Sequence, residues 1–238
     1  MPRTNPQLVD ARRARAIRER LINWEAASGR SFMWRSPTIT SFEVLVCEIL
    51  LAKTRAEVAA PVAATLLARY ANAEELAKAR VRDLERLLYP LGLHKKRARH
   101  LRACARDLVA RFGGQVPASI SELMSLPYIG RYAANAIACV AFDAAVPVID
   151  ANVARIYGRV FSLPPPPPRL ANAHDLWALA DQLLPRRQAK VFNWALLDLG
   201  SIICTSRSPA CDRCPIAACC DQAASTVDRA PVSITLHL

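Results

Sequence analysis

The chain is organised around residues 126–150, which begin Leu126-Pro127-Tyr128-Ile129-Gly130-Arg131-Tyr132 and end Val148-Ile149-Asp150. The beginning of this stretch predicts a helix, a tight turn and a second helix starting at Arg131. Pro127 fixes φ and cannot continue the preceding helix, and Gly130 is expected to supply the positive φ of the turn. The N–H groups of the turn and of the new helix then converge on one point, where an anion such as a DNA phosphate fits. Asp150 opens a further helical run.

Length and charge narrow the class of protein. A chain of 238 residues can bury one substantial core or two smaller adjoining ones. The formal charge of +12 and the pI near 9.8 favour a polyanion binder, with an ordinary basic enzyme as the alternative. No apolar run of about eighteen residues or more predicts a membrane span. The N-terminus lacks the apolar core of a signal peptide, so a cytoplasmic, nucleoid-associated protein is expected.

Apolar residues recur at spacings of three and four almost everywhere, and only seven glycines occur. The fold class is therefore predicted to be all-α. Ser41 is the expected cap of a strongly apolar helix, and Pro164 to Pro168 form a stiff surface spacer. Residues 222–238 show no helical pattern, and 232–238 read as a loose strand. The expected helices cover 7–27, 42–54, 56–70, 73–78, 81–89, 95–112, 118–125, a run from 131, 151–161, 171–184 and 188–202.

Four cysteines near the C-terminus form the strongest metal signal. Eight cysteines in a reducing compartment favour metal ligation over disulfides. A cluster of four thiolates suits either a 4Fe-4S cluster or tetrahedral zinc, and Cys219, next to the last of them, leaves the fourth ligand open. Three other cysteines, Cys47, Cys104 and Cys139, lie on apolar helix faces and are expected in the core. The motif reads Cys204-x6-Cys211-x2-Cys214-x5-Cys220.

These motifs together resemble the helix-hairpin-helix DNA glycosylase superfamily that contains endonuclease III. The resemblance covers about residues 20–220 and is most specific at 126–155 and 204–220. It implies two helical domains with an interdomain cleft: residues 29–145 as a six-helix domain with the hairpin, 1–28 and 146–221 as a cluster domain, and 222–238 as a tail. It also favours the 4Fe-4S cluster over zinc. A monomer is expected.

The resemblance assigns the chemistry to three residues. Asp150 would stabilise the positive charge that develops as the base leaves and would position the water. Glu48, a carboxylate within the apolar run 42–54, would contact the extruded base; a structural glutamate is the alternative. Tyr132 stands where bifunctional relatives carry a lysine. A phenol cannot form the Schiff base of a lyase, so a monofunctional glycosylase is predicted.

The same resemblance assigns DNA contacts. The hairpin is expected to grip the backbone, although Tyr128 replaces the usual glycine and alters phosphate affinity there. Ala52 is too short to fill the gap left by the flipped nucleotide, so either Lys53 or a residue elsewhere in the chain is expected to fill it. The DNA-binding candidates are Pro127, Tyr128, Gly130, Arg131, Lys53 and Arg207.

Three functions follow from these assignments. Tyr132 and Glu48 resemble the mismatch-specific thymine glycosylases most, which predicts removal of thymine or uracil opposite guanine in double-stranded DNA, within base excision repair. An adenine glycosylase acting opposite guanine or 8-oxoguanine is the alternative. A non-catalytic iron-sulphur DNA-binding protein is the third hypothesis.

Overall fold

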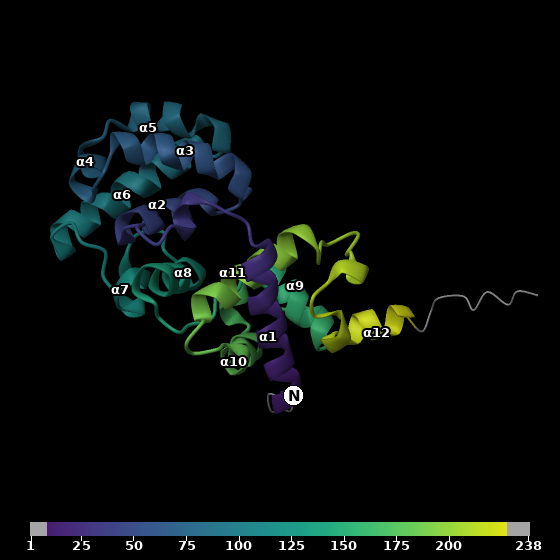
Figure 1. Cartoon of the computed structure of the whole chain (residues 1–238). Coiled ribbons are helices and arrows are strands. Elements are labelled where there is room, and N and C mark those ends of the chain that lie inside the picture. Colours follow the sequence, from purple (N-terminus) through teal and green to yellow (C-terminus); the bar gives the residue numbers. More distant parts are fainter. Residues whose placement is uncertain (1–8, 228–238) are drawn as a thin grey trace, which may run out of the picture. The chain divides into compact units, whose positions relative to one another are not determined.

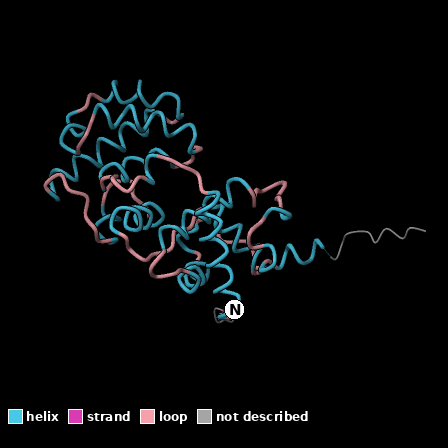
Figure 2. Tube along the Cα trace, in the orientation of Figure 1, coloured by secondary structure: helices cyan, strands magenta, loops and turns pink. Residues whose placement is uncertain are grey.

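The computed structural model describes residues 9–227, with the side chains of 225–227 left out. Over this part of the chain every regular element is a helix, as Figure 2 shows, so the predicted all-α class is confirmed. The chain divides into two compact units, the first formed by Met1–Arg30 with Ile149–Leu238 and the second by Ser31–Val148. The sequence-based boundaries at 28/29 and 145/146 lie two to three residues away from these.

The second unit is built on one apolar helix, α2 (Ser41–Leu51). Seven of its eleven residues are buried, which is the pattern of a helix covered on most sides. α2 packs against three helices: α3 (Ala56–Arg69), α6 (His94–Phe112) and α8 (Arg131–Phe142). The remaining elements of this unit are η1 (Met33–Arg35), α4 (Ala73–Lys78), α5 (Val81–Leu88), η2 (Tyr89–Leu91) and α7 (Ile120–Ser125).

The first unit joins the N-terminal helix to the C-terminal part of the chain. α1 (Ala11–Ser28) packs on α11 (Ala189–Ile202), which in turn packs on α9 (Ala151–Val160). An ion pair follows the end of α1. The Arg30 guanidinium and the Arg30 backbone N–H both donate to the buried Asp198 carboxylate, each at 2.8 Å. Figure 1 labels these helices. The unit also contains η3 (Leu170–Asn172), α10 (His174–Leu183), η4 (Cys211–Arg213), η5 (Ala217–Cys219) and α12 (Asp221–Val227).

Two expectations were wrong, one about a helix cap and one about a segment without helix. The cap of α2 is Thr40 and not Ser41: Thr40 accepts a hydrogen bond from the N–H of Glu43, whose side chain binds back to Thr40. This capping box needs the Thr-x-x-Glu spacing, which Ser41 lacks. Residues 222–227, at the start of the segment expected to have no helical pattern, belong to α12 (Asp221–Val227). The strand expected at 232–238 lies outside the described residues.

Candidate active site

The hairpin turn lies between α7 and α8 in the second unit. Leu126 and Ile129 are buried and anchor it, and the Ile129 N–H donates to the Leu126 carbonyl at 3.3 Å. Pro127 and Tyr128 are the two central residues of the turn, with φ +67° at Tyr128. A proline followed by a residue of positive φ is the arrangement of a type II turn, which usually takes glycine at the second position. The expectation of positive φ at Gly130 was wrong, because the turn ends before it.

Gly130 is the first residue before α8 and has an extended backbone, with φ −96° and ψ 178°. No side chain caps the helix, and its first turn contains no acidic residue. A Cβ placed on Gly130 would meet no atom within 4 Å, so neither backbone strain nor crowding explains the glycine. The start of α8 has no side-chain cap and follows the exposed Gly130, which leaves room for an anion to approach beside Arg131.

Two candidate residues lie on this hairpin helix and on a helix that packs against it: Tyr132 on α8 and Glu48 on α2. α2 packs on α8, which places the Glu48 helix directly against the Tyr132 helix. Both side chains are partly buried, and the Oε2 atom of Glu48 is buried. Burial, followed by the negative charges of Glu48 and Glu43, raises the pKa of Cys47 to about 12, so this thiol is inert.

Arg97 holds the turn that follows α2, a role that sequence reasoning did not find. Its guanidinium is buried and donates to the carbonyls of Ile49, Leu50 and Ala52, to the Thr54 hydroxyl and to the Gly92 carbonyl. Burial lowers the pKa of this guanidinium. The two turns that it joins carry exposed residues with left-handed backbone, Lys53 (φ 59°) and Leu93 (φ 51°). Leu93 is 59% exposed and thus becomes a second candidate beside Lys53 for a contact with DNA.

Asp150 belongs to the first unit and begins α9. Its Oδ1 accepts from the Val153 N–H at 2.8 Å, and its Oδ2 accepts from Asn152 Nδ2 at 2.9 Å. The Arg155 guanidinium then binds Asn152 Oδ1 at 2.9 Å, the Gly200 carbonyl at 2.7 Å and the Cys204 carbonyl at 3.0 Å. The carboxylate is therefore held from both oxygens, and a continuous chain of hydrogen bonds leads from it to the first cysteine of the motif.

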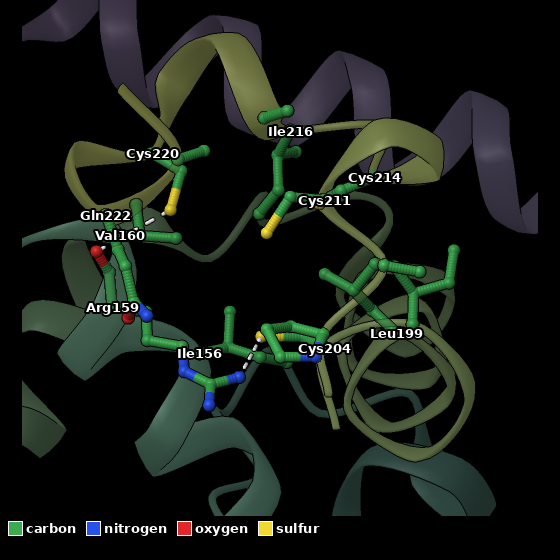
Figure 3. Close-up of a pocket in the computed structure, with 15 residues that line it drawn as sticks. Ile156, Arg159, Val160, Leu199, Cys204, Cys211, Cys214, Ile216, Cys220 and Gln222 are labelled. Atoms are coloured by element: carbon green, nitrogen blue, oxygen red, sulfur yellow. Dashed lines mark hydrogen bonds between the residues drawn. The ribbon is translucent and has the colours of Figure 1, made fainter. Parts of the chain in front are cut away.

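All four cysteines of the motif line one cavity, together with apolar side chains from α9 and α11 (Figure 3). Burial raises the pKa of Cys214 to about 11. Arg159 approaches the cavity with Nη1 3.3 Å from the Cys204 sulfur. Four sulfurs around one cavity are the donor set that a 4Fe-4S cluster or zinc takes. Among the described residues, no group of three or more His, Cys, Asp or Glu is spaced to hold a single metal ion. Arg207 is exposed on the same loop.

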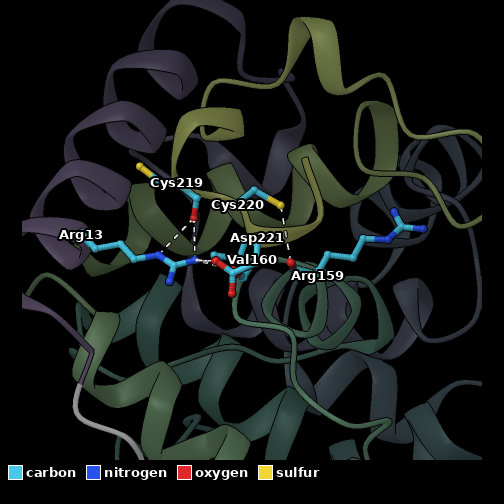
Figure 4. Close-up of polar contacts among 6 residues, drawn as sticks. All are labelled: Arg13, Arg159, Val160, Cys219, Cys220 and Asp221. Atoms are coloured by element: carbon cyan, nitrogen blue, oxygen red, sulfur yellow. Dashed lines mark hydrogen bonds and ion pairs between the residues drawn. The ribbon is translucent and has the colours of Figure 1, made fainter. Parts of the chain in front are cut away.

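The two adjacent cysteines differ in direction. Cys220 lines the cavity and Cys219 does not, and Figure 4 shows their sulfurs pointing to different sides of the chain. Arg13 of α1 fixes this segment: its guanidinium binds the Cys219 carbonyl at 3.2 and 3.0 Å and the Asp221 carboxylate at 2.6 Å. It also lies over the Phe161 ring, 4.7 Å from the centroid.

These features define a helical protein with three marks: a hairpin whose second helix has no side-chain cap, an aspartate that caps a helix and is hydrogen-bonded through both oxygens, and a cavity lined by four cysteines. The HhH-GPD superfamily, described as base excision DNA repair proteins, matches residues 46–180. The chain is 36% identical to a thymine-DNA glycosylase of Aeropyrum pernix over 87% of this chain and 94% of that protein. It is 34% identical to an adenine DNA glycosylase of Mycolicibacterium smegmatis, over 84% of this chain and 67% of that protein.

The fold agrees with these relatives. The solved structure of a thermostable thymine-DNA glycosylase superposes with a TM-score of 0.84 at 28% identity, covering 90% of this chain and 98% of the other. The chain therefore belongs to the HhH-GPD superfamily of base excision DNA repair proteins, and the predicted resemblance is confirmed. Within the described residues no helix is both long and apolar enough to span a membrane.

Proposed function

We propose that this protein is a monofunctional DNA glycosylase that removes thymine or uracil opposite guanine by hydrolysis. The observation that carries the proposal is Tyr132 in the first turn of α8, where a nucleophilic amine would be needed for a covalent intermediate. A phenol supplies no such amine, so strand scission requires a later alkaline step. The 36% identity to a thymine-DNA glycosylase supports the choice of base.

Base release requires a carboxylate that is fixed in position. The base is first flipped out of the duplex at a cost of a few kcal/mol, least at a mismatch. Asp150 then stabilises the positive charge that develops on the sugar and orients the water. Because both its oxygens already accept a hydrogen bond, its orientation is set before the substrate binds. Glu48, on the helix that packs against α8, hydrogen-bonds the base or assists its departure.

The hairpin provides the grip on the DNA backbone. Its N–H donors at the start of α8 receive one phosphate, and Arg131 adds a positive charge. Pro127 sets the turn that presents them. Lys53 and Leu93 contact the duplex from the two turns that Arg97 joins, and Arg207 adds an exposed positive charge on the cysteine loop. The protein acts as a monomer on double-stranded DNA.

A 4Fe-4S cluster held by Cys204, Cys211, Cys214 and Cys220 completes the proposal. The bound cluster stabilises the loop that carries Arg207, and the hydrolysis needs no electron from it. Cys220→Ser should lower the iron content of the purified protein and its visible absorbance, whereas Cys219→Ser should leave both unchanged, because Cys219 does not line the cavity. Equal loss of iron in both variants would contradict this assignment. If the purified protein contained zinc and no iron, the four cysteines would hold a zinc ion and not a 4Fe-4S cluster.

Single-turnover base release tests the function. The purified protein is incubated with duplexes that carry thymine, uracil or adenine opposite guanine or 8-oxoguanine, and the strands are analysed before and after alkali. The proposal requires release of thymine and uracil opposite guanine, with scission only after alkali. Release of adenine alone would favour the adenine glycosylase alternative, which the 34% identity to an adenine DNA glycosylase supports.

A further inference from the structure

Tyr128 has an unusual combination of properties. Its backbone is left-handed, with φ +67°, and its side chain is 62% exposed. The ring nevertheless has a fixed neighbour, because it stacks on His100 of α6 with 3.4 Å between the ring centroids and 12° between the planes. An exposed tyrosine is thus held in one orientation beside the hairpin.

The backbone of Tyr128 opposes its presence at this position. A non-glycine residue with left-handed backbone costs on the order of 1–2 kcal/mol, and the second central position of a type II turn accepts glycine without that cost. Strained residues persist mainly where the side chain has a task. The ring is on the surface, so burial in the core cannot be that task.

The surroundings of the partner ring favour its neutral form. Burial, followed by the positive charges of Lys96 and Arg97, lowers the pKa of His100. The stack covers one face of the tyrosine ring. In the part of the chain that the structure describes, no hydrogen bond from the Tyr128 hydroxyl is found, so the hydroxyl is available to an external acceptor.

The surroundings indicate what that acceptor is. Lys96 lies one helical turn before His100 on α6, and Lys95 and Arg99 are exposed on the same helix. Two residues after Tyr128 come the uncapped start of α8 and then Arg131. The stack with His100 thus attaches Tyr128 to a basic helix on one side, and the chain leads to Arg131 on the other, which favours an anion near this residue.

We propose that the Tyr128 hydroxyl donates a hydrogen bond to a phosphate of the DNA strand next to the one held by α8, with His100 as a positioning residue. This inference rests on the proposed binding of DNA but not on the base that is removed. A neutral donor contributes direction without charge. The contact should therefore strengthen binding equally at all salt concentrations, unlike a lysine or arginine contact, which steepens the salt dependence.

The test measures binding by fluorescence anisotropy in the Asp150→Asn background, which prevents turnover. The probes are a labelled duplex with thymine opposite guanine and its fully paired counterpart, each at several salt concentrations. Tyr128→Phe removes only the hydroxyl and is expected to raise Kd about tenfold on both probes, with an unchanged salt slope. Tyr128→Gly should raise Kd at least as much without lowering the unfolding midpoint, because relief of the left-handed backbone offsets the lost stack.

The chain offers a matched control and a test of positioning. Tyr89 is 71% exposed and also contacts a histidine of α6, His94. Here, however, the ring centroids are 5.2 Å apart, the ring planes are tilted by 51°, and the backbone of Tyr89 is ordinary right-handed helical. Tyr89→Phe should leave Kd unchanged. His100→Ala should raise Kd about threefold in the presence of the tyrosine hydroxyl and have no further effect in the Tyr128→Phe variant. A purely structural histidine would lower stability in both backgrounds without this dependence.

The outcomes separate this contact from the activity. Wild-type binding by Tyr128→Phe, or tighter binding by Tyr128→Gly, would overturn the inference and mean that the ring only crowds the hairpin, even if base release is normal. Weaker binding by Tyr128→Phe in a protein that releases no base from any duplex would sustain the contact and refute the proposed function instead.

Discussion

The starts of α8 and α9 differ in whether a side chain caps their first N–H groups. Every helix begins with N–H groups that have no partner within the helix. α9 fills this position internally, with the Asp150 carboxylate bonded to the Val153 N–H, whereas α8 begins at Gly130 without any side-chain cap. In the proposed function, the capped start of α9, the filled end, holds the carboxylate that acts on the sugar, and the uncapped start of α8, the open end, receives a phosphate. Under this proposal, catalysis and DNA binding use the same structural feature, a helix start, with and without a side-chain cap.

The largest effect is expected from changing the filled end while its geometry is kept. Asp150→Asn retains an oxygen that accepts from the Val153 N–H, so α9 should keep its cap and the unfolding free energy should change little. The negative charge is lost, and single-turnover base release should fall by about 10²–10³-fold or more. DNA binding should persist. Asp150→Ala, which also removes the cap, should cost about 1 kcal/mol of stability. Normal base release by Asp150→Asn would refute the catalytic role.

The second effect comes from filling the open end. Gly130→Asp places a carboxylate where α8 now has none, and an aspartate cap should stabilise the helix by about 0.5–1 kcal/mol. The same charge repels a phosphate, so Kd for duplex DNA should rise about 10- to 100-fold. Thermal unfolding and anisotropy measure the two changes. A variant that is stabilised and still binds DNA normally would show that no phosphate occupies this helix start.

Gly130→Ser separates charge from occupancy. A serine caps the helix as well as aspartate does but carries no charge. We expect a similar gain in stability with a loss of affinity of only a few-fold. If serine and aspartate weakened binding equally, crowding and not repulsion would be the cause.

The contrast between the two helix starts shows how far the sequence predicts this site. Asp150 followed by an apolar helical run correctly predicts a helix start, and the cap follows locally because the Asp150 side chain and the Val153 N–H are three residues apart. The hairpin turn was predicted from Gly130, yet Tyr128 bears the positive φ. The turn type depends on the burial of Leu126 and Ile129, which overrides the local preference of Tyr128.

Contacts between distant residues set the remaining limits. The cysteine spacing predicts four ligands but does not distinguish Cys219 from Cys220, since contacts with residues distant in sequence help to fix the direction of this segment. Arg13 binds the Cys219 carbonyl from more than two hundred residues away, and the Cys220 thiol contacts the Arg159 carbonyl. Arg97 belongs to the basic run Lys95-Lys96-Arg97-Ala98-Arg99, and a run of this kind ordinarily forms a solvated helix face. Its burial against the carbonyls after α2 follows from the packing of α6 on α2, which no local pattern reveals.

A third effect concerns the packing that supports the filled end. A Cβ on Gly200 of α11 would lie 2.7 Å from Asn152 Cβ, so Gly200→Ala must move α11 from α9. We expect a loss of about 1–3 kcal/mol of stability, measured by denaturant unfolding. Because Asn152 donates to Asp150, single-turnover base release should also slow, by about tenfold.

Gly158→Ala is the control for this change. Gly158 lies inside α9, and a Cβ there meets no atom within 4 Å. An alanine in a helix interior should therefore stabilise the protein by about 0.5–1 kcal/mol and leave base release unchanged. Slower base release by both variants would indicate a general sensitivity of α9 and not the contact with Asn152.

The smallest effect is expected at the open end itself. Gly130→Ala adds one methyl group in open space on backbone that any residue adopts, so the fold has no reason to resist it. The poorer cap costs about 0.5–1 kcal/mol, and the reduced freedom of the unfolded chain returns about 0.4–1 kcal/mol, which leaves stability nearly unchanged. The methyl group nevertheless occupies space at the uncapped start of α8, and Kd for duplex DNA should rise a few-fold. If Gly130→Ala lowered stability like Gly200→Ala and left DNA binding intact, the glycine would serve the fold, and the contrast between an open and a filled helix start would lose its basis.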